Sequence, residues 1–414
     1  MKILYLFQHF VPPDKPGITR VYEYATRLMK NGHEVHIITS PENLPEYQNL
    51  KTPTEVTIAN IPCTIIPVAY SHHMGYTERL ISYFGFAFYS TLVAIKRDAD
   101  VIVAVSTPLT IAIPGIITHL WKRKPMVFEL GDLWPATPFE MGIIKNPILK
   151  FGASVLEWLA YHNSAHIVAL SEGIAEGVLA RGYDASKVSV ITNASDTHLF
   201  DVPPATGKPI RDRLLLKDHE KLVVYTGTFG EANGAEYLVD IAKEMYSIDD
   251  RIKFLMVGDG KRKGIALERA KSYGILGKTI FIEGPISKKD VPAILSAATI
   301  TTVFYGKYNV IWRTITANKL FDSFAAGKPI AINENRVGWL IPLFAETGVG
   351  VGLSPVDAHL AAHELYDFLN DEEKLKRATE SARNLAYHRF NRDVLAQRFE
   401  EVLISVVHEN KTRI

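Results

Sequence analysis

The sequence is almost without cysteine and carries no excess of either charge. Cys63 is the single cysteine among 414 residues, which excludes disulfide bonds within the chain, cysteine-based zinc sites and iron–sulfur clusters. Lys and Arg number 46 against 45 Asp and Glu, so the net charge of +1 argues against a nucleic-acid protein that depends on bulk positive charge. Because 47% of the residues are hydrophobic and 22% are charged, we expect a soluble globular chain of two or three domains.

Hydrophobic runs long enough to cross a membrane are also lacking. The apolar start Met1–Phe7 is short and has no small-residue cleavage site after it, so we expect a buried strand rather than a signal peptide. The uncharged stretch Leu80–Ile95 would measure about 24 Å as a helix, less than the ~30 Å hydrocarbon core. It is interpreted either as a core helix or as a helix resting in the membrane interface. We expect a cytoplasmic protein, with peripheral contact to the inner face of the cell membrane through 80–95 as the open alternative.

Strands alternate with helices from the first residues onward. Lys2–Phe7, Tyr22–Lys30 and Glu34–Thr39 predict a strand–helix–strand unit, with Asn31-Gly32 ending the helix. Further strands are predicted at 100–105, 125–129, 166–170, 188–191, 222–225, 252–257, 279–282, 300–304 and 329–332. This alternation predicts an α/β fold of parallel, doubly wound sheets.

The alternation lapses once, at residues 201–213. This segment has three prolines and no apolar period, so we interpret it as a linker. It separates an N-terminal domain (1–200) from a C-terminal domain (214–375), and a helical segment (376–414) is expected to cross back to the N-terminal domain. If the two sheets face each other, their carboxyl ends border a central cleft, where such folds bind ligands.

Three glycine-containing turns follow predicted strands. Gly17 lies in the first loop, whereas Thr226–Glu231 (TGTFGE) and Val257–Gly260 (VGDG) follow strands of the second half. At such turns, free backbone N–H groups can bind a diphosphate, and small residues let a base lie against the backbone. Ordinary tight turns are the alternative. The GxGxxG pattern of a classical dinucleotide site is absent from the first loop.

The strongest constellation of candidate functional residues is WRTITANKLFD (312–322). Asn318 is expected to open a helix, with Arg313 in the preceding loop and Lys319 in the first turn, so that both cations reach one phosphate. Asp322 lies one turn beyond Lys319 and is placed to accept both hydroxyls of a ribose. In the first half, Asp132 follows a buried strand, where it is expected to orient a hydroxyl or stabilise positive charge on a sugar ring. The alternative for 312–322 is a surface charge cluster with a helix N-cap, and the alternative for Asp132 is an Asx turn or a helix cap.

Taken in order, these elements resemble the family 4 glycosyltransferases of the GT-B fold, especially bacterial transferases that build O-antigen and capsule repeat units on a lipid carrier. The resemblance covers essentially the whole chain. It rests on PPDKPGITR, DLWP at Asp132–Pro135, VITNASDTHLF, GTFGEANG, VGDG, EGPI and RTITANKLFDSFAAGKP. It implies two facing Rossmann-like domains and a retaining transferase that uses a nucleotide-sugar, usually UDP-linked, with no metal cofactor. The implied acceptor is a glycan or a polyprenyl-diphosphate-linked sugar.

The resemblance also implies a role for each matching residue. Arg313 and Lys319, with the Gly227–Gly230 backbone, would hold the diphosphate, and Asp322 would bind the ribose. The base would be contacted by Gly258, Asp259, Gly260 and Pro285. The sugar and acceptor would be faced by Gly17, Asp132 and Asn193. Further substrate contacts are expected from Arg20, Thr228, Gly230, Glu231, Asn318 and Leu320.

Several positions depart from the family pattern. Ile18 replaces the second glycine of the first loop, Gly131 stands where many relatives have His or Arg, Asn233 stands in place of a common Lys, and Asp322 replaces the usual Glu. The Asp98-Ala99-Asp100 motif matches the metal-binding DxD of other glycosyltransferases, but it precedes a strand instead of ending one, so we expect solvated carboxylates there.

Three alternative functions stay open on the sequence. They are a GDP-mannose-dependent mannosyltransferase, a sugar-nucleotide epimerase of the same fold, and a non-catalytic nucleotide-sugar-binding subunit, which Gly131 and Asn233 motivate.

Overall fold

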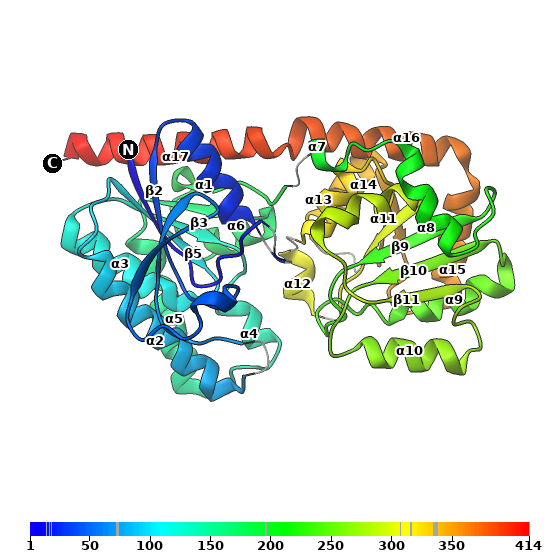
Figure 1. The fold of residues 1–414 in the computed structure, drawn as a ribbon, viewed down its shortest axis with the longest axis horizontal. Helices are drawn as coiled ribbons and strands as arrows, with labels where there is room; N and C mark the ends of the chain where they lie inside the picture. The colour runs from blue at the N-terminus through cyan, green and yellow to red at the C-terminus, as the bar shows by residue number, and fades with distance from the viewer. Residues whose placement is uncertain are drawn as a thin grey trace. The chain divides into compact units, whose positions relative to one another are not determined.

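A computed structural model describes residues 1–13, 15, 17, 19–71, 74–194, 197–306, 308–314, 317–333 and 338–413. The chain forms two compact units. The first comprises Met1–Thr192 with Asp393–Ile414, and the second comprises Asn193–Arg392. Each unit is built on its own sheet with helices packed against it (Figure 1). The predicted α/β fold class is therefore confirmed.

The first unit contains an eight-stranded sheet in the order β3-β4-β2-β1-β5-β6-β7-β8. Neighbouring strands are parallel except β3 and β4, which form an antiparallel hairpin at one edge. The strands are β1 (Lys2–Leu6), β2 (Glu34–Thr39), β3 (Thr54–Ile58), β4 (Ile61–Ile65), β5 (Val101–Ser106), β6 (Met126–Leu130), β7 (His166–Ala169) and β8 (Val188–Val190).

Helices cover both faces of this sheet. One face packs against α2 (Tyr76–Ala94), α3 (Ala112–Lys122), α5 (Pro147–His162) and α6 (Glu172–Leu179), whose inner side chains share one apolar core with alternate strand residues. The other face packs against α1 (Arg20–Lys30) and α17 (Arg392–Arg413), because the Phe399 ring contacts both Tyr5 of β1 and Tyr24 of α1. The short helix α4 (Ala136–Glu140) follows β6.

The second unit contains a six-stranded, fully parallel sheet in the order β11-β10-β9-β12-β13-β14. Its strands are β9 (Lys221–Thr226), β10 (Ile252–Val257), β11 (Ile280–Glu283), β12 (Ile300–Val303), β13 (Ile330–Asn333) and β14 (Gly350–Leu353). Its helices are α7 (Thr197–Phe200), α8 (Lys208–Arg213), α9 (Tyr237–Ile248), α10 (Lys263–Ser272), α11 (Val291–Ala297), α12 (Asn309–Arg313), α13 (Asn318–Ala325), α14 (Leu340–Thr347), α15 (Ala358–Asn370) and α16 (Glu372–Asn384). Two apolar cores, one on each face of the sheet, hold these layers together.

The predicted strands are all present, with ends shifted by at most one residue. The hairpin β3–β4 and strand β14 were not predicted. The hairpin turns through Ala59 and Asn60, both with positive φ (47° and 68°), so its sequence lacks the glycine that usually marks such a turn. Leu80–Ile95 falls almost entirely within α2. Among the described residues, no helix combines the length and apolar character that crossing a bilayer requires.

The boundary between the units differs from the expected linker. Residues 201–213 belong to the second unit, where Pro204–Gly207 and α8 form short helices packed on α11. Prolines that were interpreted as linker residues lie in the first turns of these helices, where proline is well tolerated. Of the segment 376–414, residues up to Arg392 belong to the second unit, and Asp393–Ile414 belong to the first.

Candidate active site

The predicted nucleotide-binding segments of the second unit lie at one edge of its sheet. Because all six strands are parallel, their carboxyl ends meet at the same edge. Thr226–Glu231 follows β9, Gly258–Gly260 follows β10 and Pro285 follows β11, and these three strands are neighbours. Thr228 and Pro285 are exposed there.

Gly258 and Gly260 allow the loops after β9 and β10 to touch through their backbones. Both have positive φ (154° and 148°), and an added Cβ would lie 1.8 Å from the Gly227 carbonyl oxygen and 2.5 Å from that of Phe229, respectively. Two backbone hydrogen bonds join the loops, from Gly227 N to Val257 O (3.0 Å) and from Phe229 N to Asp259 O (2.9 Å). This close approach is reason enough for glycine at both positions. A contact with a base stays a prediction.

Lys319 lies against the first of these loops. It is the second residue of α13, and its Nζ is 3.2 Å from Asn233 Oδ1 and 3.5 Å from the Tyr225 hydroxyl. The ammonium also lies 4.5 Å from the centre of the Tyr225 ring and 5.6 Å from that of Tyr305. A Cβ built on Gly227 would be 3.8 Å from Nζ. The structure therefore brings together Gly227 and Lys319, two residues that the sequence analysis assigned to one diphosphate.

The surroundings of the Lys319 ammonium are neutral. Burial lowers its pKa from 10.5 to about 7, and among the described residues no carboxylate forms an ion pair with it. Its contacts are an amide oxygen, a hydroxyl and two aromatic faces, which stabilise a cation far less than a carboxylate or phosphate does. A ligand anion would supply the missing opposite charge. Asn233, where many relatives have Lys, provides the oxygen that orients this ammonium.

Arg313 is an exposed residue at the end of α12. The adjacent Trp312 anchors this helix, because its indole N–H donates to Gly306 O (2.9 Å) and its ring packs edge-on against Tyr305 (5.4 Å). Since the Tyr305 ring faces Lys319, α12 is held beside the same site.

Helix α13 carries three other predicted residues. Asp322 is half-buried and lies on the same face as Lys319, three residues further along. Asn318, also half-buried, is the first residue of the helix. The Leu320 side chain is fully buried in the core and its N–H donates to Ala317 O (3.1 Å), so its contribution to the site is to fix the helix.

The remaining predicted residues of this unit are polar groups of the same loops. Glu231 Oε1 accepts a hydrogen bond from the Tyr308 hydroxyl (3.0 Å), which ties the loop after β9 to the start of α12. Asp259 Oδ1 accepts from Gly260 N (2.9 Å) and stabilises its own turn. Thr228 O accepts from the Tyr225 hydroxyl (2.8 Å). Asn193, expected to face the sugar, is buried at the start of the second unit.

Arg20 of the first unit has all of its donors engaged inside the protein. Its Nε and one terminal nitrogen donate to the Glu129 carboxylate (3.0 and 3.4 Å), and the terminal nitrogens also donate to Ile191 O, Thr192 O and the Tyr24 hydroxyl. A guanidinium has five N–H groups, so none is left over for a substrate. Arg20 was predicted to contact substrate; its geometry is that of a residue that fixes the start of α1 to β6 and to the end of β8.

Asp132 follows the carboxyl end of β6, as predicted. It is half-buried, and burial raises the pKa of its carboxyl group. Gly131, just before it, donates its N–H to Ser106 O (3.3 Å), and a Cβ there would lie 3.0 Å from that oxygen. A glycine thus suits the packing between β5 and β6. Gly17 is exposed, with φ of 144°.

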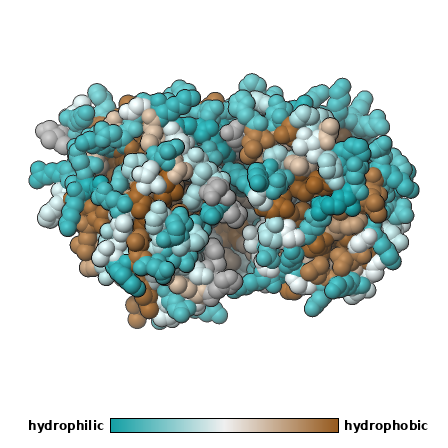
Figure 2. Space-filling view, viewed as in Figure 1, coloured by the Kyte–Doolittle hydropathy of each residue, from teal (hydrophilic) through white to brown (hydrophobic). Residues whose placement is uncertain are grey.

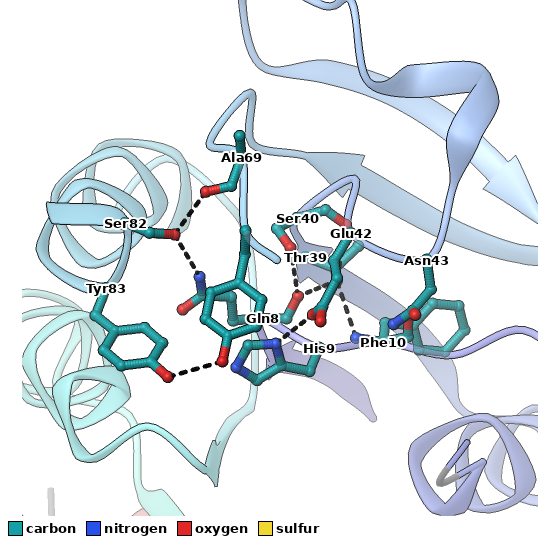
Figure 3. Close-up of polar contacts among 11 residues, drawn as sticks. Gln8, His9, Phe10, Thr39, Ser40, Glu42, Asn43, Ala69, Ser82 and Tyr83 are labelled. Atoms are coloured by element: carbon teal, nitrogen blue, oxygen red, sulfur yellow. Dashed lines mark hydrogen bonds and ion pairs between the residues drawn. The ribbon is translucent and has the colours of Figure 1, made fainter. Parts of the chain in front are cut away.

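A histidine–carboxylate pair that the sequence analysis missed lies in the first unit (Figure 3). His9 follows β1, Glu42 follows β2, and His9 Nδ1 contacts Glu42 Oε2. The His9 ring also packs edge-on against Tyr70 (4.7 Å), whose hydroxyl is 3.1 Å from that of Tyr83. Because β1 and β2 are parallel neighbours, their carboxyl ends meet, and this was the available sequence signal. Such a pair can hold a substrate hydroxyl and move a proton.

The DxD motif lies at the amino ends of strands, as expected. Asp98 forms an ion pair with Lys2 Nζ (2.7 Å), and Asp100 accepts from Lys2 N (2.8 Å). In the part of the chain that the structure describes, no three His, Cys, Asp or Glu side chains gather into a metal-binding group. The expectation that the reaction needs no metal stays a prediction.

Comparison with known proteins identifies the enzyme class. Residues 18–199 match the family model described as Glycosyltransferase Family 4, and residues 208–385 match Glycosyl transferases group 1. The chain is a glycosyltransferase. It is similar to the putative colanic acid biosynthesis glycosyl transferase WcaI of Escherichia coli (strain K12), 23% identical over 300 residues that cover 68% of this chain and 72% of the relative. It is also similar to the uncharacterized glycosyltransferase MJ1607 of Methanocaldococcus jannaschii, 20% identical over 90% of both chains.

Comparison with solved structures identifies the fold of this glycosyltransferase. Anabaena Alr3699/HepE in complex with UDP-glucose matches with a TM-score of 0.73 at 17% identity, covering 98% of this chain and 100% of that one. Sucrose-phosphate synthase from Thermosynechococcus elongatus matches with a TM-score of 0.75 at 15% identity, covering 99% of both chains. The predicted GT-B fold is confirmed.

Proposed function

We propose that this glycosyltransferase is a retaining enzyme of cell-surface polysaccharide synthesis that moves a hexose or N-acetylhexosamine from a UDP-sugar. The observation that carries the proposal is the Lys319 ammonium, held against Gly227 among neutral groups and lacking an anion of its own within the described residues. A nucleotide diphosphate would provide that anion. Support for the polysaccharide pathway comes from the name of the relative WcaI, and support for the donor from the Anabaena structures with UDP and UDP-glucose.

Glycosyl transfer builds positive charge on the sugar ring and negative charge on the departing diphosphate. We assign stabilisation of the diphosphate to Lys319, to Arg313 at the end of the neighbouring helix, and, within Gly227–Gly230, to the backbone N–H groups of Thr228 and Gly230, since those of Gly227 and Phe229 bond to Val257 O and Asp259 O. The positive end of the α13 dipole adds to their effect. Asp322 is proposed to accept the ribose hydroxyls, and Gly258–Gly260 with Pro285 to contact the base.

Retention needs no protein nucleophile in this proposal. The acceptor hydroxyl attacks the anomeric carbon on the side from which the diphosphate leaves, and a phosphate oxygen takes its proton. The C–O bond to the diphosphate breaks as the new glycosidic bond forms, so the anomeric configuration of the donor is kept. No metal ion is invoked, because the cations and helix end named above neutralise the leaving group.

The first unit is assigned to the acceptor. Asp132, which follows the carboxyl end of β6, is proposed to stabilise positive charge near the sugar ring, and Gly17 of the same unit to face the acceptor. The His9–Glu42 pair is proposed to bind the acceptor hydroxyl. We propose a glycan or polyprenyl-diphosphate-linked acceptor, reached from the cytoplasmic side of the membrane with contact through residues 80–95.

A nucleotide panel tests the donor. We expect UDP to raise the melting temperature of the protein more than GDP or ADP does, and a UDP-sugar to be consumed only when acceptor is present. A larger shift with GDP would favour a mannosyltransferase, and conversion of the UDP-sugar without acceptor would favour an epimerase; either result would overturn the proposal. Proton NMR of the product should show the anomeric configuration of the donor.

A further inference from the structure

Three neighbouring helices of the first unit carry exposed apolar side chains on their outer sides. In α5, Ile148 and Phe151 are 77% and 73% exposed, and Val155 and Trp158 continue the same stripe at helical spacing. We call the outer sides of α2, α3 and α5 the three-helix face.

The other two helices repeat this pattern. In α2, Ile81, Phe84 and Phe88 are exposed at helical spacing, while Phe86 on the opposite side is buried. In α3, Trp121 is 72% exposed. Soluble proteins rarely leave so many large apolar side chains in water on adjacent helices, so this face is expected to have a partner.

The exposed stripes point the same way. Helix α3 packs against α2 on one side and against α5 on the other, and the inner sides of all three share one core on the same face of the eight-stranded sheet (Figure 1). Their outer sides are therefore turned together away from the sheet. Figure 2 shows apolar surface over this part of the first unit.

The charges of the three helices favour contact with an anionic partner surface. Their sequences contain only two carboxylates, Glu78 and Glu157. Glu78 caps its own helix by accepting from Gly75 N (2.7 Å), and Glu157 is buried in an ion pair with Arg181. Basic residues stand at or just beyond the helix ends, at Lys96, Lys122, Arg123, Lys124, Lys145 and Lys150. Two carboxylates shortly after α2, Asp98 and Asp100, are bonded to Lys2. Apolar side chains bordered by Lys and Arg, with exposed Trp, are typical of a surface that rests in a lipid headgroup region.

We propose that the three-helix face docks on a bilayer that contains anionic lipid, with α2, α3 and α5 lying in the interface and not crossing it. This extends the contact proposed for residues 80–95 to two further helices, and α5 contributes its most exposed side chains. The inference depends on the proposed function in one respect, namely that the bilayer would carry the lipid-linked acceptor. Vesicle binding itself needs no sugar transfer, so the two proposals fail separately.

Vesicle flotation of the full chain tests the inference. We expect the wild type to float with phosphatidylcholine vesicles that contain phosphatidylglycerol, and less with phosphatidylcholine alone. The variants Ile148→Glu/Phe151→Glu and Phe84→Glu/Phe88→Glu should each reduce partitioning by about tenfold or more, since each removes two large apolar side chains from the interface. Added salt should weaken binding to the anionic vesicles.

A matched control uses exposed apolar residues of the second unit. Val356, 88% exposed, and Leu360 lie outside the three-helix face, so Val356→Glu/Leu360→Glu should float like the wild type. Unchanged melting temperature and UDP binding show that each variant is folded. The inference is overturned if the α5 variant floats like the wild type. It is also overturned if the wild type ignores vesicles but forms a dimer that the α5 variant abolishes, because the face would then bind a second copy.

Discussion

Replacing Lys319 with Met should stabilise the nucleotide-free protein. The Met side chain has a similar length and gives up the cation–π contact with the Tyr225 ring, but it also removes a charge that burial disfavours. The same substitution should impair the enzyme, because the charge is proposed to bind the donor diphosphate. Residues selected for ligand binding often lower the stability of the empty protein in this way.

The magnitude follows from the pKa of the ammonium. At about 1.4 kcal/mol per pKa unit, lowering it from 10.5 to about 7 corresponds to at most about 5 kcal/mol. Partial exposure of Lys319 and loss of its hydrogen bond to Asn233 reduce the expected gain to about 2 kcal/mol. For a unit of this size, that gain raises the melting temperature by roughly 4–8 °C.

The pH dependence has a definite sign. The pKa of Lys319 is lower in the folded protein than in the unfolded chain. The loss of folding free energy caused by this buried charge is therefore complete below a pH of about 7 and fades as the pH rises toward 10.5. The advantage of Lys319→Met should therefore be largest at about pH 6 and small at about pH 9.5. Burial lowers the pKa of Lys328 to about 8, but this lysine is present in both proteins. Its effect on stability therefore cancels when the melting temperatures of the wild type and Lys319→Met are compared.

Calorimetric melting of both proteins without nucleotide, at these two pH values, is the assay. A variant that melts below the wild type at both pH values would refute the reasoning, because Lys319 would then be stabilised by an anion of the protein itself. An advantage independent of pH would assign the effect to packing.

Three further substitutions probe the other groups. Arg313→Ala should lower turnover by about 100-fold while leaving the fold intact, because it removes a charge from the leaving-group site, and wild-type activity would refute this role. Arg20→Met should cost about 3–5 kcal/mol by leaving Glu129 buried without its partner, and Arg20→Met/Glu129→Leu should recover part of that loss in a denaturant melt; no recovery would argue against the ion pair. His9→Gln should reduce kcat/KM for the acceptor by about tenfold or more without changing UDP affinity, whereas an equal loss of UDP affinity would contradict the assignment of His9 to the acceptor.

Strand positions were predictable because a buried parallel strand is a short β-branched run between turn residues. Val101–Ser106 (VIVAVS) is such a run, and Ile252–Val257 (IKFLMV) is a short apolar run with the length of a strand. The hairpin β3–β4 escaped prediction because alternate side chains of β3, Glu55 and Thr57, face solvent and its turn uses Ala59 and Asn60 instead of glycine. The segment 201–213 was misjudged because proline begins a helix as readily as it ends one.

The candidate site was predictable in part for the same kind of reason. The family resemblance assigned Gly227 and Lys319 to one diphosphate, and the structure brings the two residues together because glycines after parallel strands and a cation at a helix start converge on one sheet edge. Sequence cannot show that a charge is satisfied internally, so Arg20 was assigned to substrate although Glu129, far along the chain, engages it. The contact between His9 and Glu42 could not be predicted either, because it depends on β1 and β2 being neighbours in the sheet.

Isothermal titration of UDP into the wild type, Lys319→Met and Lys328→Met tests the central claim most directly. Lys328 is a second buried lysine of the same unit, but it donates to Ser296 O and Ala298 O, away from the carboxyl edge. We expect Lys319→Met to weaken UDP binding by at least about tenfold, the value of a hydrogen bond to a charged group, and Lys328→Met to leave it unchanged. Equal affinity of the wild type and Lys319→Met would contradict the account.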